Sequence, residues 1–298
     1  MFDNGLLKYF KTHVDKSGFL KAYMLEKEAE RLEEYKFLRK LKIEDNTHSY
    51  YLKYFTGTIG VEGLTQEIQE KIGAEVLLSQ IYSKAGLNTA IYYPAIYKDG
   101  ELGVISNDIS NKSTKSMENY CFEMQNSGLS FTSPYEDGYL TPGLIGFRNF
   151  MTIEAMKDFV KAHVFFCASG NYDGNPTNIL VDTQKRDGKL DLITDVKLID
   201  FGNNIFRFDP KYEQFIEYHT GLGRGGLKTK EDFVEDLKVN SFVQSVYSTN
   251  EMAEMLGQVD VIETAQNIKE EIDFEVPQNL VDRIAKSFDT TASELIMG

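Results

Sequence analysis

The sequence has few of the residues that build disulfides and structural metal sites. It contains two cysteines, Cys121 and Cys167, and four histidines among 298 residues. Two cysteines in a chain of this length make a disulfide framework implausible, and no spacing of His and Cys indicates a zinc site. Cys167 falls on the apolar face of an expected helix, which predicts a packed thiol.

Long apolar runs and excess positive charge are also absent. No run approaches the roughly 18 apolar residues of a membrane span, and residues 1–5 lack the pattern of a signal peptide. The net charge of −14 argues against nucleic acid or an anionic membrane as the main partner, because both favour basic patches. We therefore expect a cytoplasmic protein with an acidic surface and neither kind of partner.

The chain is long enough, and apolar enough, for a large core. Its 298 residues are 42% hydrophobic, and this length suits two lobes that form one unit. No internal repeat and no low-complexity tract interrupts it.

Three oxygen-bearing side chains are the most informative feature of the sequence. Asp173 and Asn178 lie five residues apart directly before the apolar run Ile179–Val181, and Asp200 ends the next apolar run, Val196–Ile199. The two runs read as short buried strands, which would bring Asn178 and Asp200 beside each other. Carboxylate and amide oxygens suit Mg²⁺, and phosphoryl transfer also needs an acidic residue near the acceptor hydroxyl. A turn rich in Asp, Asn and Gly is the simpler structural alternative.

A lysine and a glutamate upstream extend this pattern. Tyr50–Phe55 is aromatic and prone to form a strand that contains Lys53, and Gln66–Ala85 reads as a helix ended by Gly86. Glu75 lies on the apolar stripe of that helix, where a carboxylate needs a partner. We expect it to pair with Lys53 and to fix the lysine for the phosphates of ATP. The alternatives are a snorkelling lysine on an edge strand and a surface carboxylate.

The segment Gly170–Asn178 resembles the catalytic loop of HipA-like serine/threonine kinases and their phosphoinositide-kinase relatives, which run Gly-Asn-x-Asp-x-His-x-x-Asn. The helix around Glu75 is similar to that of the short, CtkA-type members. In motif terms the resemblance spans Lys53 to Gly202. It implies Asp173 as catalytic base or substrate-orienting carboxylate, Asn178 and Asp200 as magnesium ligands, Lys53 as phosphate anchor and Glu75 as the partner of that lysine.

Two departures from the family pattern are visible. Asn175 stands where the family has histidine, and the polar turn Lys42–Ser49 before Lys53 contains no glycine. The run Gly57–Gly63 could cover the phosphates instead, since glycine allows close backbone approach. A flexible loop between strand and helix is the alternative for that run.

The resemblance implies an α+β, two-lobed, protein-kinase-like fold. We expect an N-lobe over residues 1–108, with an N-terminal extension, a small sheet and the Glu75 helix, and a mainly helical C-lobe over 109–298. The implied reaction is transfer of the γ-phosphoryl group of ATP, with Mg²⁺, to a protein serine or threonine, including the protein itself. A small-molecule kinase of aminoglycoside type, a lipid kinase, a nucleotide-binding pseudokinase and a nucleotidyl transferase are the alternatives. The pattern from Asp173 to Val181 is shared with the aminoglycoside-type enzymes.

Several further elements are expected from periodicity and turn signals. In the first half, Leu20–Leu41 is expected to be a charged helix, or its last part a strand paired with Tyr50–Phe55, and Thr89–Lys98 forms a hairpin with Glu101–Ser106. The crossing between the lobes is expected at Ser106–Ile109, and irregular structure over 110–150. The second half is expected to contain a helix capped by Thr152 and reaching Ala168, helical segments over Tyr212–His219, Glu231–Leu256 and Pro277–Ile296, and an acidic linker near Glu270–Glu275. His163 and His219 are expected to be structural.

Overall fold

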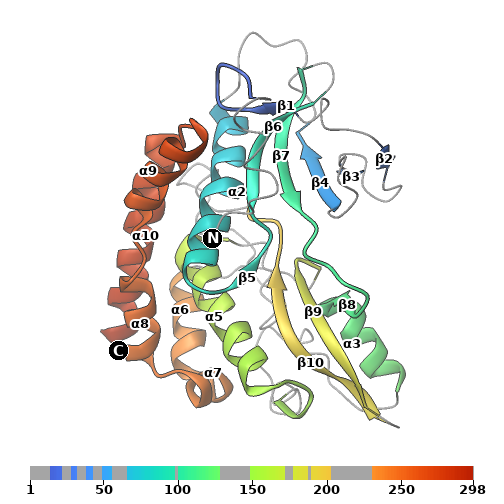
Figure 1. The fold of residues 1–298 in the computed structure, drawn as a ribbon. Helices are drawn as coiled ribbons and strands as arrows, with labels where there is room; N and C mark the ends of the chain where they lie inside the picture. Colours follow the sequence, from blue (N-terminus) through green and yellow to red (C-terminus); the bar gives the residue numbers. More distant parts are fainter. Residues whose placement is uncertain are drawn as a thin grey trace. The chain divides into compact units, whose positions relative to one another are not determined.

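The computed structural model describes residues 14–21, 28–31, 38–42, 49–55, 66–97, 100–127, 148–171, 177–186, 189–202 and 230–297. The chain divides into two compact units (Figure 1). The described residues of the first unit lie before Ala85, in Thr89–Ile109 and in Asp260–Asp282, and the others belong to the second. The sequence pattern does not indicate that Asp260–Asp282 joins the first unit, and the lobe boundary at residue 108 stays a prediction.

The first unit is built on a six-stranded sheet with the order β1-β6-β7-β4-β3-β2. Its strands are β1 (Leu20–Lys21), β2 (Glu28–Arg31), β3 (Leu38–Lys42), β4 (Ser49–Tyr54), β6 (Tyr92–Ile96) and β7 (Leu102–Asn107). The predicted hairpin is confirmed, since β6 and β7 pair antiparallel and Gly100 has φ +79° in the turn between them. The charged helix over Leu20–Leu41 is wrong. The alternative for its last part, a strand paired with Tyr50–Phe55, is confirmed. These residues form β3, which pairs with β4, because cross-strand pairing outweighs the helix propensity of Glu, Lys and Leu.

The helix α2 (Gln66–Lys84) packs against β6 and against α9 (Val261–Ile272) within the same unit. Residues 72–82 are all buried, so this helix has no solvent face along most of its length. Its buried positions include the polar residues Glu75, Ser79 and Gln80, which need polar partners inside the protein. Gly86 follows with φ +82°, the left-handed conformation expected after a helix end.

The second unit contains a four-stranded sheet with the order β5-β10-β9-β8. Its strands are β5 (Asn88–Thr89), β8 (Thr114–Ser116), β9 (Ile179–Arg186) and β10 (Lys189–Leu198). The hairpin β9–β10 contains both of the apolar runs read as strands. The expectation of irregular structure over 110–150 is wrong for its first part, where β8 leads directly into α3 (Met117–Asn126). There the pairing of β8 with β9 supplies order that the polar composition does not suggest.

The helix α5 (Ile153–Ser169) follows the short 3₁₀ helix η3 (Arg148–Phe150) and is the central helix of the second unit. Thr152 caps it as predicted, because its side chain accepts a hydrogen bond from the backbone N–H of Ala155. Gly170 ends it with φ 62°. Cys167 and Cys121 are both buried and free, in agreement with the expected packed thiol.

The helical segment expected over Glu231–Leu256 is three helices. These are α6 (Lys230–Val239), α7 (Ser241–Val246) and α8 (Thr249–Gly257). Asn240 and Ser248 separate them, since each side chain caps the helix that follows. The acidic linker near Glu270–Glu275 is also wrong in its first part, which is the end of α9, while α10 (Gln278–Ile296) agrees with the last predicted helix. The predicted helix Tyr212–His219 lies outside the described residues. Among those that are described, no helix is both long and apolar enough to cross a membrane.

Candidate functional site

Lys53 and Glu75 form an ion pair inside the first unit. Lys53 Nζ lies 2.8 Å from Glu75 Oε1, and the side chains are 26% and 0% exposed, respectively. The pairing expected from the sequence is thus present. Because only the lysine side chain is partly exposed, Lys53 is the member of the pair that solvent or a ligand can reach.

The sheet and helix around the pair argue against both structural alternatives. The strand β4 lies between β3 and β7, where Lys53 stands opposite Leu38 and Val104, so Lys53 does not lie on an edge strand. The carboxylate of Glu75 is fully buried, so it does not belong to the surface. A buried carboxylate is costly unless it is paired. The pair therefore couples the position of α2 to the position of the lysine on β4.

Asn178 and Asp200 stand at the same end of the hairpin β9–β10 in the second unit. Leu198 pairs with Ile179 in the last register position, and the backbone N–H of Ile199 donates to the carbonyl of Asn178 over 3.1 Å. This hydrogen bond extends the pairing of β9 with β10 by one residue. The backbones of Asn178 and Asp200 therefore lie close to each other, as the apolar runs predict. Asn178 is 9% exposed, whereas Asp200 is more accessible.

Asp200 has a backbone conformation that its residue type rarely adopts. Its φ is +62°, and Asp273 is the one other non-glycine residue with a positive φ among those the structure describes. A non-glycine residue pays roughly 1 kcal/mol or more for this region, and such outliers cluster at functional sites. Asp200 is followed directly by Phe201 and Gly202, which are both buried.

The donor chemistry of Asn178 and Asp200 fits magnesium. An amide oxygen and a carboxylate at the end of one hairpin are hard ligands, and Mg²⁺ takes one or two carboxylates and completes its shell with water and phosphate. Within the described part of the chain, no group of three or more His, Cys, Asp or Glu side chains could hold a metal by itself.

Asp173, Asn175 and the run Gly57–Gly63 lie outside the described residues. The helix that precedes Asp173 in the chain is described. The helix α5 is buried from Phe159 to Ser169 except at Lys161, and the backbone N–H of Asn171 donates to Phe166 O over 2.9 Å. Two residues, Gly170 and Asn171, thus lie between the end of this buried helix and the segment that contains Asp173. The assignment of Asp173, Asn178, Asp200, Lys53 and Glu75 to roles in catalysis stays a prediction.

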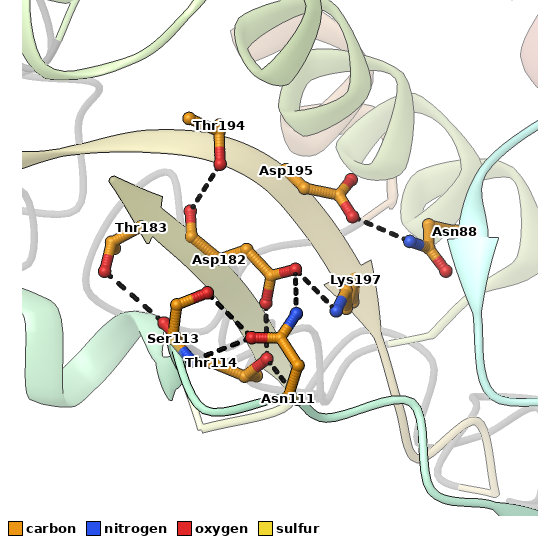
Figure 2. A network of polar contacts seen from close by, with 9 residues as sticks. All are labelled: Asn88, Asn111, Ser113, Thr114, Asp182, Thr183, Thr194, Asp195 and Lys197. Carbon is orange, nitrogen blue, oxygen red and sulfur yellow. Dashed lines mark hydrogen bonds and ion pairs between the residues drawn. The ribbon is translucent and has the colours of Figure 1, made fainter. Parts of the chain in front are cut away.

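A polar network beside the hairpin was not anticipated from the sequence (Figure 2). Asp182 on β9 accepts hydrogen bonds from Lys197 on β10 over 2.7 Å, from Asn111 Nδ2 over 2.6 Å and from the hydroxyl of Thr114. Lys197 is 5% exposed. One signal was available, because a lysine inside the apolar run Val196–Ile199 requires a buried partner.

This network sets the charge state of its central carboxylate. Burial disfavours the ionised form of Asp182, but the hydrogen bonds from Lys197, Thr114 and Asn111 outweigh it and hold the pKa of Asp182 below its usual range. The ionised carboxylate links Asn111 and Thr114, at the start of β8, to β9 and β10. Asn178 directly precedes β9, and Asp200 follows β10. On the opposite edge of β10, Asn88 Nδ2 donates to Asp195 over 2.8 Å. The hairpin is therefore fixed on both sides (Figure 2).

Comparisons with known proteins identify the fold. No protein-family model matches the chain, and no curated protein matches its sequence. Among solved structures, the chain is similar to CtkA, a proinflammatory kinase of Helicobacter pylori, with a TM-score of 0.60 and 14% identity over 93% of this chain and 95% of that one. It is also similar to HipA of Shewanella oneidensis, solved with HipB and operator DNA, with a TM-score of 0.51 and 11% identity over 88% of this chain and 65% of that one.

These similarities show the fold of the chain. It is a protein-kinase-like α+β fold of the CtkA and HipA type, with small sheets and a helical C-terminal part. This agrees with the fold class and the family resemblance inferred from the motifs. The chain spans about two thirds of the length of HipA, and nearly all of CtkA.

Proposed function

We propose that the chain is an ATP- and Mg²⁺-dependent phosphotransferase that acts on serine or threonine hydroxyl groups of proteins, including its own. The observation that carries this proposal is the ion pair of Lys53 with the fully buried Glu75 at 2.8 Å. A partly exposed lysine, fixed by a buried carboxylate on a neighbouring helix, is suited to binding phosphate oxygens. The fold, shared with a kinase of known structure, supports the same reading.

The residues of the chain have distinct tasks in this proposal. Lys53 holds the α- and β-phosphates, and Glu75 restricts the lysine to the rotamer that reaches them. Asn178 and Asp200 hold Mg²⁺, which when bound neutralises charge on the phosphates. Asp173 accepts a hydrogen bond from the acceptor hydroxyl and orients it toward the γ-phosphoryl group. Catalysis of this kind is mostly positioning, so the rigid hairpin and the buried helix α5 matter as much as the charges.

A small-molecule kinase is the second candidate. The pattern Asp-x-x-Pro-x-Asn-Ile-Leu-Val over Asp173–Val181 is shared with aminoglycoside-type enzymes, and the net charge of −14 suits a polycationic acceptor. Asn171 and Tyr172 argue against it, because those enzymes usually carry His-Gly before the aspartate.

The test is transfer of labelled γ-phosphate from ATP with Mg²⁺ to protein, lipid and aminoglycoside acceptors. Label on protein supports the proposal, label on an aminoglycoside supports the second candidate, and intact mass spectrometry distinguishes added phosphate from added AMP. Asp173→Ala should abolish transfer and largely preserve nucleotide affinity, because the carboxylate acts on the acceptor. Nucleotide binding without transfer to any acceptor would identify a pseudokinase.

A further inference from the structure

The helix α2 is contacted on two opposite faces. Glu75 points to Lys53 on β4, and Gly73 lies two residues earlier. Since successive residues of a helix are about 100° apart, Gly73 and Glu75 lie about 200° apart around the axis. The face that contains Gly73 is covered by the C-terminal segment Asp260–Asp282, which belongs to the same unit (Figure 1).

The segment approaches the backbone of α2 closely at Gly73. A Cβ atom added there would lie 2.9 Å from Pro277 Cδ, 3.2 Å from Leu280 Cδ2 and 3.4 Å from Val276 Cγ1. The first distance is shorter than a real Cβ contact, and a proline ring cannot rotate away from it. Glycine in the interior of a helix is otherwise unfavourable. Its presence here is explained by the packing of residues 276–280.

Polar contacts extend along the same face of α2. Asn279 Nδ2 donates to Glu70 Oε1 over 2.8 Å, and Gln66 Nε2 donates to the same oxygen over 3.0 Å. About three turns after Gly73, Lys84 Nζ donates to Thr264 Oγ1 on α9 over 3.2 Å. The segment therefore holds α2 near its start, at its middle and at its end.

The segment is also attached to the sheet of the first unit. Phe274 packs edge-on against Phe19, with ring centroids 5.6 Å apart. Gly18, next to that phenylalanine, has φ +79°, and a Cβ there would collide with the backbone carbonyl of Asp273. Because Leu20 starts β1, which pairs with β6, the segment has a fixed attachment apart from the helix.

We propose that the segment Asp260–Asp282 is an intramolecular clamp that sets the position of α2, and with it the Lys53–Glu75 pair, with Gly73 and Asn279 as its positioning residues. This proposal rests on the proposed function only in its consequence for catalysis. In the absence of the clamp, the outer face of α2 would lose its partners, and the helix would be held from the sheet side alone. Glu75 would then no longer be fixed opposite Lys53. The segment Asp260–Asp282 thereby determines the position of the Lys53 side chain.

Two substitutions in the full-length protein test the clamp. Asn279→Asp places a second carboxylate against Glu70 without changing volume, and adding Glu70→Gln restores a donor and acceptor pair. Gly73→Ala adds one methyl group against Pro277. Alanine is a better helix former than glycine, so a looser α2 in that variant cannot come from helix propensity. Gly257→Ala is the matched control, because a Cβ at that helical glycine meets nothing within 4 Å.

Three measurements test the clamp: hydrogen exchange of α2, acylation of Lys53, and the KM values of the reaction. Hydrogen exchange of the α2 amides and the acylation rate of Lys53, read by mass spectrometry, should each rise about tenfold in both variants. In Asn279→Asp this is the change expected when a hydrogen bond to a charged group is lost, and in Gly73→Ala it is the change expected from overpacking against Pro277. KM for ATP should rise while KM for the acceptor is unchanged. Glu70→Gln should return Asn279→Asp to within about twofold of wild type, since the two sites are directly coupled. Gly257→Ala should match wild type.

Unchanged α2 exchange in both variants would overturn the clamp. Faster α2 exchange with unchanged acylation of Lys53 would overturn its link to the ion pair. If the wild-type protein transfers no phosphate, the proposed function fails. Exchange and acylation then still decide whether the clamp exists, because neither measurement depends on activity.

Discussion

At the scale of single residues, the buried pair of Lys53 and Glu75 carries an energetic consequence. Removing one partner of a buried ion pair leaves the other charge without compensation, whereas replacing both by apolar groups is often neutral. Glu75 is 0% exposed, so it cannot regain water in the folded state. The pair is thus better explained by its effect on the position of Lys53 than by a contribution to the stability of the fold.

Lys53→Met should therefore destabilise the protein by about 2 kcal/mol or more, and Lys53→Met combined with Glu75→Leu should recover most of that loss. Both variants should lose phosphoryl transfer, since neither retains the ammonium group. Urea unfolding and transfer kinetics measure the two effects. Lys238→Met is the control, because the pair of Lys238 with Glu235 at 3.6 Å has an acidic partner that is 61% exposed, and its loss should cost less than about 1 kcal/mol. Equal costs for the two lysines would contradict the prediction.

Asp200 is a proposed metal ligand and also has a positive φ. Substitutions can separate the effect of its carboxylate from the effect of its backbone conformation. Asparagine tolerates φ +62° and retains one oxygen, whereas alanine does not favour that conformation. Asp200→Asn should keep the free energy of unfolding within about 0.5 kcal/mol of wild type, while Asp200→Ala should lower it by about 1 kcal/mol. Both should weaken nucleotide binding in the presence of Mg²⁺, measured by calorimetry. Unchanged binding in both variants would remove Asp200 from the metal site.

At the scale of elements, local signals explain what the sequence could predict. The helix α2, the hairpin β6–β7 and the hairpin β9–β10 each have their boundaries marked by apolar periodicity and by glycine or Asp-Gly turns. The division of α6, α7 and α8 also had a signal. Ser248 and Glu251 form a capping box, which the sequence Ser-Thr-Asn-Glu contains.

Other elements had no local signal because long-range contacts decide them. Residues 28–31 have helical composition, and pairing with β3 makes them the strand β2, whereas the strand in residues 38–42 was one of the two alternatives for its segment. The same holds for the candidate site. Spacing predicted that Asn178 and Asp200 meet and that Lys53 pairs with Glu75, because each relation depends on adjacent elements. The network around Asp182 and the segment that covers Gly73 involve residues about 70 and 200 positions apart, and no periodicity indicates such partners.

The helix α5 places a histidine where protonation opposes folding. His163 is 0% exposed between Phe159 and Phe166, and its Nδ1 donates to Phe159 O over 2.7 Å. Burial lowers the pKa of His163 to about 4, although the hydrogen bond to Phe159 opposes that shift. The unfolded chain therefore binds a proton more readily than the folded protein below the ordinary pKa near 6.5.

Stability should accordingly fall as the pH is lowered from about 6.5 toward 4, by up to about 3 kcal/mol from this residue. Urea unfolding at several pH values measures this dependence. Titration of other groups, such as Asp158, whose pKa is raised by burial and by Asp195, contributes to the total. The difference between wild type and His163→Met isolates the histidine, because the variant lacks only that titration. A constant difference between pH 7 and pH 4.5 would contradict the prediction.

At the scale of the whole molecule, a ligand that binds at the proposed site should increase the free energy of unfolding. A ligand that binds only the folded state stabilises it by RT ln(1 + [L]/Kd), which is about 2.7 kcal/mol at a concentration of 100 Kd. In the proposed function, Lys53 would bind phosphate oxygens without a metal, whereas Asn178 and Asp200 would contribute only when Mg²⁺ is present. The stabilisation by nucleotide should therefore have a part that depends on magnesium.

A non-hydrolysable ATP analogue should raise the free energy of unfolding more with Mg²⁺ than with EDTA, because in the proposed function the metal adds contacts to Asn178 and Asp200 that the nucleotide alone does not make. Asp200→Asn should lose the magnesium-dependent part and keep the remainder, whereas Lys53→Met should reduce the stabilisation under both conditions. Thermal unfolding of the three proteins, with and without the metal, separates these contributions. Asp191→Asn is a suitable control, since Asp191 lies on β10 far along the strand from Asp200. Equal stabilisation with Mg²⁺ and with EDTA in the wild type would show that Asn178 and Asp200 do not hold a nucleotide-bound metal, whatever their proximity.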